Sequence, residues 1–192
     1  MYRARTTRTS CGSRWHLLHQ TLAGLALLTL ALGAPAGADP GNAGRAPDLG
    51  ACSQLKAPEG SVVALQAFGV GVQIYRWDGT TWTGPVPAAT LFADSGDHGV
   101  VATHFGGPTW QSLGGSRVVG TVIDKCTPDP TAIPWVLLGV ASQDGPGIFD
   151  QVTSIQRLNT VGGIAPTTPG AVIGQEARVP YTALYVFYRF PH

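Results

Sequence analysis

β-Strand patterns, more than any other feature, limit what this chain can fold into. The clearest is ARVPYTALYVFYRF at residues 177–190, a run rich in aromatic and β-branched residues. Helices would need apolar residues three and four positions apart over ten or more residues, and only residues 149–158 approach that spacing. Further strand patterns, separated by Gly, Pro and Asp turns, occur at residues 61–79, 99–105, 109–113, 116–126, 135–142 and 149–163.

These patterns predict an all-β fold, a single-domain antiparallel sandwich or barrel of about seven to nine strands. The charged fraction of 12% and the 26 Gly residues agree with short strands joined by turns. Residues 80–94 contain Pro85 and Pro87, so we expect irregular or edge structure there. Gly69 and Gly71 share one face of the first strand and indicate a bend or the close approach of another chain.

The N-terminal segment has the pattern of a secretory signal peptide. Four arginines precede an apolar run at residues 22–34, and Ala36 and Ala38 follow at the spacing that signal peptidase recognises. A membrane anchor is the rival interpretation, but the run is shorter than the ~20 residues of a spanning helix. We therefore predict a secreted or periplasmic protein without a stable membrane anchor. Its segments would be a signal peptide at 1–38, a flexible lead-in at 39–58 and one β-domain at 59–192.

Net charge changes sign once the predicted signal peptide is removed. All eleven Asp and Glu remain, with eight of the twelve Lys and Arg, which gives a formal net charge of −3. A mildly acidic chain without runs of Lys or Arg argues against nucleic acid as a partner. A small molecule or a carbohydrate is the partner class that we keep, and the sequence leaves the oligomeric state open.

Two cysteines remain after the predicted cleavage, Cys52 and Cys126. In an oxidising compartment such a pair most simply forms one disulfide, which would pin the lead-in and close a loop of roughly 75 residues. In the chain-entropy model such a bond is worth about 4 kcal/mol. A metal site is the rival interpretation, but no further Cys and no close His accompanies the pair, and neither cysteine has the context of a nucleophile. We expect no cofactor.

His104, in the stretch HFGGPTWQS, is the candidate for chemistry. Its imidazole could act as a general base, and Asp97 and Asp124 are carboxylates that could orient it. It could also bind a metal together with His98, six residues away on the same side of a continuous strand. The favoured interpretation is a half-buried imidazole that bonds a backbone carbonyl, with Gly-Gly-Pro as a corner between two strands.

Aromatic and polar residues form the candidate binding surface. Exposed aromatic rings on a rigid β-scaffold could bind sugars or an apolar small molecule, whereas the rival interpretation places the same rings in the core. Arg157 needs partners if it is buried, because an unpaired buried charge is costly, and two acidic neighbours would make it structural. The binding candidates are Trp82, Trp110, Gln111, Arg157, Asn159 and Tyr181.

Six motifs occur in order along the chain: LQAFGVGVQIYRWDG, HFGGPTWQ, GSRVVG, IPWVLL, VTSIQRLNTVGGIAP and RVPYTALYVFY. Together they resemble a family of secreted bacterial and fungal proteins catalogued as domain of unknown function 3455. The resemblance covers nearly all of the chain after the predicted signal peptide. It implies a small exported domain with no established activity, substrate or cofactor. Some fungal members carry a malate dehydrogenase label, but GVGVQI has only two glycines of a dinucleotide-binding turn and continues as strand.

Three departures from the family pattern accompany this resemblance. The family tends to have cysteine where Trp77 stands here and a second one in the loop after GGIAP, which in this chain reads TTPGAVIGQE. Loss of both together would suit a disulfide dropped as a unit, leaving Cys52 and Cys126 as the remaining pair. The family also tends to have an acidic residue where this chain has Leu184.

The leading functional hypothesis is a non-enzymatic binding module or one that packs at the cell surface. One alternative is an enzyme that uses His104 with a nearby carboxylate, with or without a metal. Another is a carrier that holds a small apolar ligand inside a barrel.

Overall fold

The computed structural model describes residues 45–191. The predicted signal peptide and its cleavage site after Ala38 lie outside the described residues. Within residues 45–191, no helix combines the length and the apolar character that crossing a membrane requires.

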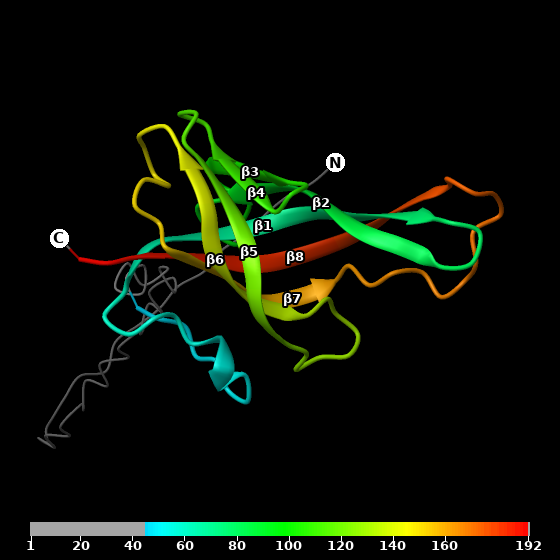
Figure 1. Cartoon of the computed structure of the whole chain (residues 1–192), viewed down its shortest axis with the longest axis horizontal. Helices are drawn as coiled ribbons and strands as arrows, with labels where there is room; N and C mark the ends of the chain where they lie inside the picture. Colours follow the sequence, from blue (N-terminus) through cyan, green and yellow to red (C-terminus); the bar gives the residue numbers. More distant parts are fainter. Residues whose placement is uncertain (1–44, 192) are drawn as a thin grey trace, which may run out of the picture. The chain divides into compact units, whose positions relative to one another are not determined.

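Eight antiparallel strands form a single closed barrel in which every strand pairs with its neighbours in the sequence and β1 also pairs with β8 (Figure 1). The predicted all-β fold is therefore confirmed, and its geometry is that of a barrel. Residues 149–158 form no helix, because β7 begins at Ser154. The strands are β1 Val62–Trp77, β2 Trp82–Phe92, β3 Val100–Phe105, β4 Thr109–Ser112, β5 Arg117–Cys126, β6 Trp135–Asp144, β7 Ser154–Gly162 and β8 Glu176–Arg189.

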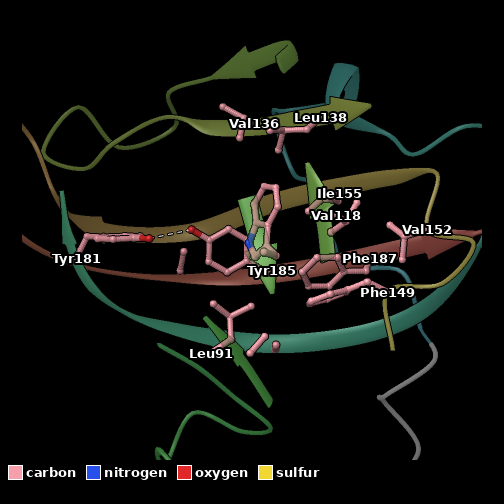
Figure 2. Packing of buried hydrophobic residues seen from close by; sticks show 14 of the residues in the cluster. Leu91, Val118, Val136, Leu138, Phe149, Val152, Ile155, Tyr181, Tyr185 and Phe187 are labelled. Carbon is pink, nitrogen blue, oxygen red and sulfur yellow. Dashed lines mark hydrogen bonds between the residues drawn. The ribbon is translucent and has the colours of Figure 1, made fainter. Parts of the chain in front are cut away.

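Buried side chains from several strands pack together in the barrel interior (Figure 2). On β8, the inward residues are Tyr181, Ala183, Tyr185 and Phe187, all buried, and the residues between them face the other way. This alternation is the period-two pattern that the sequence shows at its clearest in this strand. Other strands contribute Leu91, Val118, Val136, Leu138 and Ile155 to the same interior cluster.

A second cluster covers the outer face of the barrel with the chain that precedes β1. The short 3-10 helix η2, Ser53–Leu55, places Leu55 there, and both Leu55 and Cys52 are fully buried. Cys52 forms a disulfide with Cys126 at the end of β5, as predicted from the sequence. Gln156 extends the contact by donating its side-chain amide to the Leu55 carbonyl at 2.6 Å. Part of the predicted lead-in is thus packed against the barrel.

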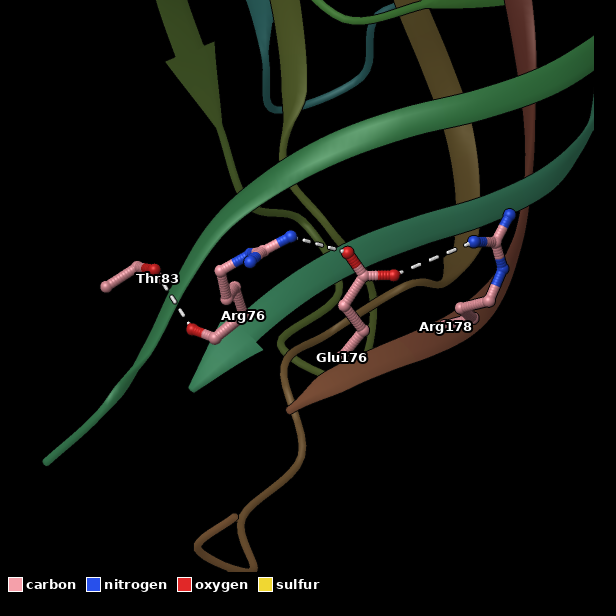
Figure 3. A network of polar contacts seen from close by, with 4 residues as sticks. All are labelled: Arg76, Thr83, Glu176 and Arg178. Atoms are coloured by element: carbon pink, nitrogen blue, oxygen red, sulfur yellow. Dashed lines mark hydrogen bonds and ion pairs between the residues drawn. The ribbon is translucent and has the colours of Figure 1, made fainter. Parts of the chain in front are cut away.

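Three strands, β1, β2 and β8, extend past the others as an arm (Figure 1). The first half of β2 pairs only with β1, whereas Ala89–Phe92 also pairs with β3. Pro85 and Pro87 lie in that first half, so the expectation of edge structure holds there and is wrong for the second half. Exposed ion pairs join Arg76 and Arg178 to Glu176 across the arm, at 2.9 and 4.0 Å (Figure 3).

Two glycines of β1 allow neighbouring groups to approach the strand closely. A Cβ atom added at Gly69 would lie 2.6 Å from the ring of Tyr185, which covers this position. A Cβ atom at Gly71 would overlap the backbone carbonyl of Ala88 on β2. The groups that approach these glycines belong to the neighbouring strands β8 and β2 of the same chain, where the prediction allowed for a bend or another chain.

Candidate ligand-binding cavity

A cavity of about 170 Å³ lies beside the turn between β3 and β4. Its polar lining comes from Gln73 on β1, His104 on β3, Arg157 on β7 and Tyr185 on β8. Its apolar lining includes Trp110, Val136 and Leu138 from the barrel interior and Val86 and Val122, which are about half exposed. Pro85, Pro87 and the turn Gly106–Pro108 complete the wall. The closed barrel thus brings together residues that lie more than 100 positions apart in the sequence.

His104 is buried and forms one layer of an aromatic stack. Its ring lies 4.3 Å from that of Trp110 at an interplanar angle of 8°, and the Tyr185 ring meets it edge-on at 5.3 Å. Its Nδ1 donates to the carbonyl oxygen of Thr109 at 2.9 Å, because a carbonyl can only accept. Burial, with a smaller contribution from the charge of Arg157, lowers the pKa of His104 to about 4, although the hydrogen bond to Thr109 opposes this shift. The imidazole is therefore neutral at neutral pH.

Neither predicted carboxylate partner lies in the cavity with His104. Asp97 is exposed in the loop between β2 and β3, and Asp124 accepts a hydrogen bond from the backbone of Lys125 on β5. The described residues that line the cavity include no Asp and no Glu. The geometry consequently offers His104 no acidic residue to orient it as a general base.

The predicted metal pair is also separated. The His98 ring is exposed and lies 3.2 Å from the carboxylate of Asp94, whereas His104 lies inside the barrel. Across the part of the chain that the structure describes, no three His, Cys, Asp or Glu side chains are grouped so that they could hold a metal ion.

Arg157 brings a positive charge to the cavity without an acidic partner. It is half-buried, and its Nε and one terminal nitrogen donate to the carbonyl of Pro134 at 3.3 and 2.8 Å. None of the ion pairs formed within residues 45–191 involves it. The cavity lining holds neither of the two acidic neighbours that would make Arg157 structural, so no acidic side chain there balances its charge.

Two further hydrogen-bond donors near Arg157 lack partners. Gln73 is 1% exposed and its Nε2 makes no hydrogen bond, and Trp110 is 1% exposed and its Nε1 makes none. Buried polar atoms without a partner are rare in proteins, and a third one among residues 45–191, Ser154 Oγ, lies outside the cavity lining. Gln73 was not a sequence candidate, although a polar residue on the inward face of β1, in line with Ala67, was an available signal.

Two tyrosines connect the cavity with the rest of the interior. The Tyr181 and Tyr185 hydroxyls lie 3.0 Å apart (Figure 2). Burial raises the pKa of Tyr185 well above its ordinary value and also raises that of Tyr181, while the charge of Arg157 opposes both shifts. Both phenols are therefore neutral. Tyr185 lines the cavity. Tyr181 does not line it but is hydrogen-bonded to Tyr185.

Three of the six predicted binding residues lie elsewhere. Trp82 packs against Trp77 at 5.4 Å and donates its indole N–H to Thr168, and Gln111 is exposed on β4. Asn159 has a positive φ of 49° at an irregularity in the β7–β8 register, so it leaves the face that carries Arg157 and is exposed. Trp110 and Arg157 line the cavity, and Tyr181 contacts a residue that does.

The positions at which the chain departs from the family pattern also lie outside the cavity. Trp77 packs against the loop that follows GGIAP, where a Cβ atom at Gly170 would lie 2.5 Å from its ring. Leu184 packs into the outer cluster with Cys52 and Leu55. An acidic residue at position 184 would therefore face the lead-in and not His104.

Comparison with known proteins agrees with this organisation. A family model described as "Protein of unknown function (DUF3455)" matches residues 58–189, which include all eight strands. No curated protein and no solved structure matches the chain. The match covers well over half of the sequence and every residue that lines the cavity. The chain therefore belongs to the DUF3455 family of proteins of unknown function.

Proposed function

We propose that this domain binds a small molecule, without turnover, in the cavity beside His104. The observation that carries the proposal is the joint presence in one cavity of an aromatic wall and an arginine without an acidic partner. Concave, mostly apolar sites with a few convergent polar groups are typical of small-molecule binding.

The volume of the cavity limits the size of the ligand. An engineered protein cavity of about 150 Å³ accommodates benzene. The cavity here, at about 170 Å³, therefore suits a single ring with a small substituent. Its half-exposed rim at Val86 and Val122 gives such a molecule a route of entry.

Binding is favoured over the enzymatic alternative by the state of His104. A general base must carry a free lone pair near the reacting proton and is usually oriented by a third group. Here the free lone pair is on Nε2, but no carboxylate lines the cavity, and a pKa of about 4 makes the imidazole a poor base at neutral pH.

We also infer that the domain works outside the cytoplasm. The arginines, the apolar run and the Ala-x-Ala spacing of the N-terminal segment support export. The Cys52–Cys126 bond supports it independently, since disulfides persist in oxidising compartments. A binding module there would meet small molecules of the surroundings, or it would pack at the cell surface.

A ligand-observed NMR screen of single-ring compounds tests the binding proposal. Wild-type protein should give hits, and Val86→Phe should weaken them because the larger side chain narrows the rim of the cavity. Val172→Phe is the matched control, since Val172 is 66% exposed and does not line the cavity. An absence of hits in the wild type, or hits that Val86→Phe leaves unchanged, would contradict the proposal.

A further inference from the structure

We infer that the cavity selects a small carboxylate, a molecule with a flat apolar body and one anionic head group. This inference rests on the proposed function and specifies the chemistry of its ligand. The shape of the cavity limits the size of the ligand, and the charges and hydrogen-bond donors around the cavity determine its head group.

The charges around the cavity favour an anionic ligand. Arg157 is the only charged residue in the described lining, because His104 is neutral and no Asp or Glu is present. A half-buried guanidinium without a counter-ion is costly, and an anion in the cavity would remove that cost. Two of its nitrogens are held by Pro134, which fixes the position of the group without neutralising it.

Hydrogen bonding points to the same ligand. The guanidinium of Arg157, which lines the cavity, can only donate hydrogen bonds. An ionised carboxylate can only accept, and its two oxygens together provide about four lone-pair positions. A carboxylate is thus the small head group that complements the charge and the geometry of an arginine.

The apolar wall determines the rest of the molecule. Val136, Leu138 and Pro108 line the cavity together with the face of the His104–Trp110 stack. Flat rings pack well against such aromatic and branched surfaces. With room for about one ring, the cavity fits an aromatic monocarboxylate, for which benzoate is the simplest probe.

Isothermal titration with benzoate and with its neutral isostere benzamide tests the inference. Benzoate should bind the wild type at least roughly tenfold more tightly than benzamide, because only the anion neutralises Arg157. Arg157→Gln should weaken benzoate binding by roughly ten- to a hundredfold and leave benzamide nearly unchanged. Arg157→Lys retains the charge and should recover part of the benzoate affinity.

Arg117→Gln is the matched control, since it removes the same charge from an exposed arginine outside the cavity and should leave both affinities unchanged. Equal binding of benzoate and benzamide, or benzoate binding that is insensitive to Arg157→Gln, would overturn the carboxylate inference and leave the proposed binding function intact. If neither compound binds and the NMR screen also finds no ring compound, the proposed function itself fails, and the inference fails with it.

Discussion

His104 shows how one buried residue links the structure of the cavity to its chemistry. Its ring is enclosed by Trp110 and Tyr185, so that protonation would place a charge among aromatic rings and close to Arg157. Burial is the larger of these two effects on its pKa. The residue is best described as a neutral wall of the cavity, and this description has a measurable consequence for stability.

We predict that His104 makes the fold sensitive to acid. Its pKa is near 6.5 in the unfolded chain and about 4 in the folded one, so the unfolded state binds more protons between these values. Above pH 6.5, His104 is neutral in both states and does not lower the stability of the fold. As the pH falls from 6.5 towards 4, only the unfolded state gains the proton, and the free energy of unfolding decreases by about 3 kcal/mol.

Urea unfolding at a series of pH values checks this. His104→Phe keeps an aromatic ring but cannot be protonated, so its stability should depend less steeply on pH, although it starts lower because Thr109 loses a donor. His98→Gln changes an exposed imidazole and should keep the wild-type slope. A wild-type slope in His104→Phe would show that other groups cause the acid sensitivity.

The residue types at the site could be predicted only in part from the sequence. The sequence indicates His104 and Trp110 because a Gly-Gly-Pro corner does not account for them, and Arg157 because a buried charge needs a partner. Gln73 was not recognised, since its importance depends on a missing hydrogen bond that only the three-dimensional structure reveals. Asn159, a predicted binding residue, lies away from the cavity because a local irregularity in β7 breaks the alternation.

At the scale of the elements, the arm formed by β1, β2 and β8 has two free strand edges. Prolines at positions 85 and 87 lie in β2, and Glu176, Arg178 and Pro180 lie at the start of β8. Prolines and charges on an edge oppose pairing with another chain. The prolines therefore did not prevent a strand; they mark the part of β2 that has a neighbour on one side only.

The outer cluster makes the segment around η2 an integral element of the fold. We predict that Leu55→Ala lowers the free energy of unfolding by about 2–4 kcal/mol, because it removes a fully buried side chain that packs on β6 to β8. Leu113→Ala provides the control, since Leu113 is exposed and should cost less than about 0.5 kcal/mol. Equal effects of the two substitutions in urea unfolding would show that the segment contributes no packing energy.

The strands could be predicted from the sequence, but the closure of the sheet could not. Alternating side chains indicate which face of a strand is buried, and a sandwich and a barrel have the same alternation. Closure depends on the pairing of β1 with β8, which lie at opposite ends of the domain. The packing of Leu55 was equally hidden, because a short 3-10 turn in a Gly- and Pro-rich segment has no strand or helix periodicity.

At the scale of the whole molecule, the disulfide and the N-terminal pattern fit an exported domain. We predict that the protein recovered from the periplasm or medium of a secreting bacterium begins at Asp39, because the Ala-x-Ala spacing ends at Ala38. Intact-mass measurement decides this to the residue. A chain that keeps residues 1–38 and stays with the cells would argue for the membrane-anchor alternative.

The central claim is that a small molecule enters the barrel next to Trp110, and the indole N–H signals in an NMR titration test it most directly. Residues 45–191 contain four tryptophans, of which only Trp110 lines the cavity. With benzoate, or with any ring compound from the screen, the Trp110 signal should shift while those of Trp77, Trp82 and Trp135 stay in place. An unchanged Trp110 signal at saturation, or a shift confined to Trp77 and Trp82, would contradict the account.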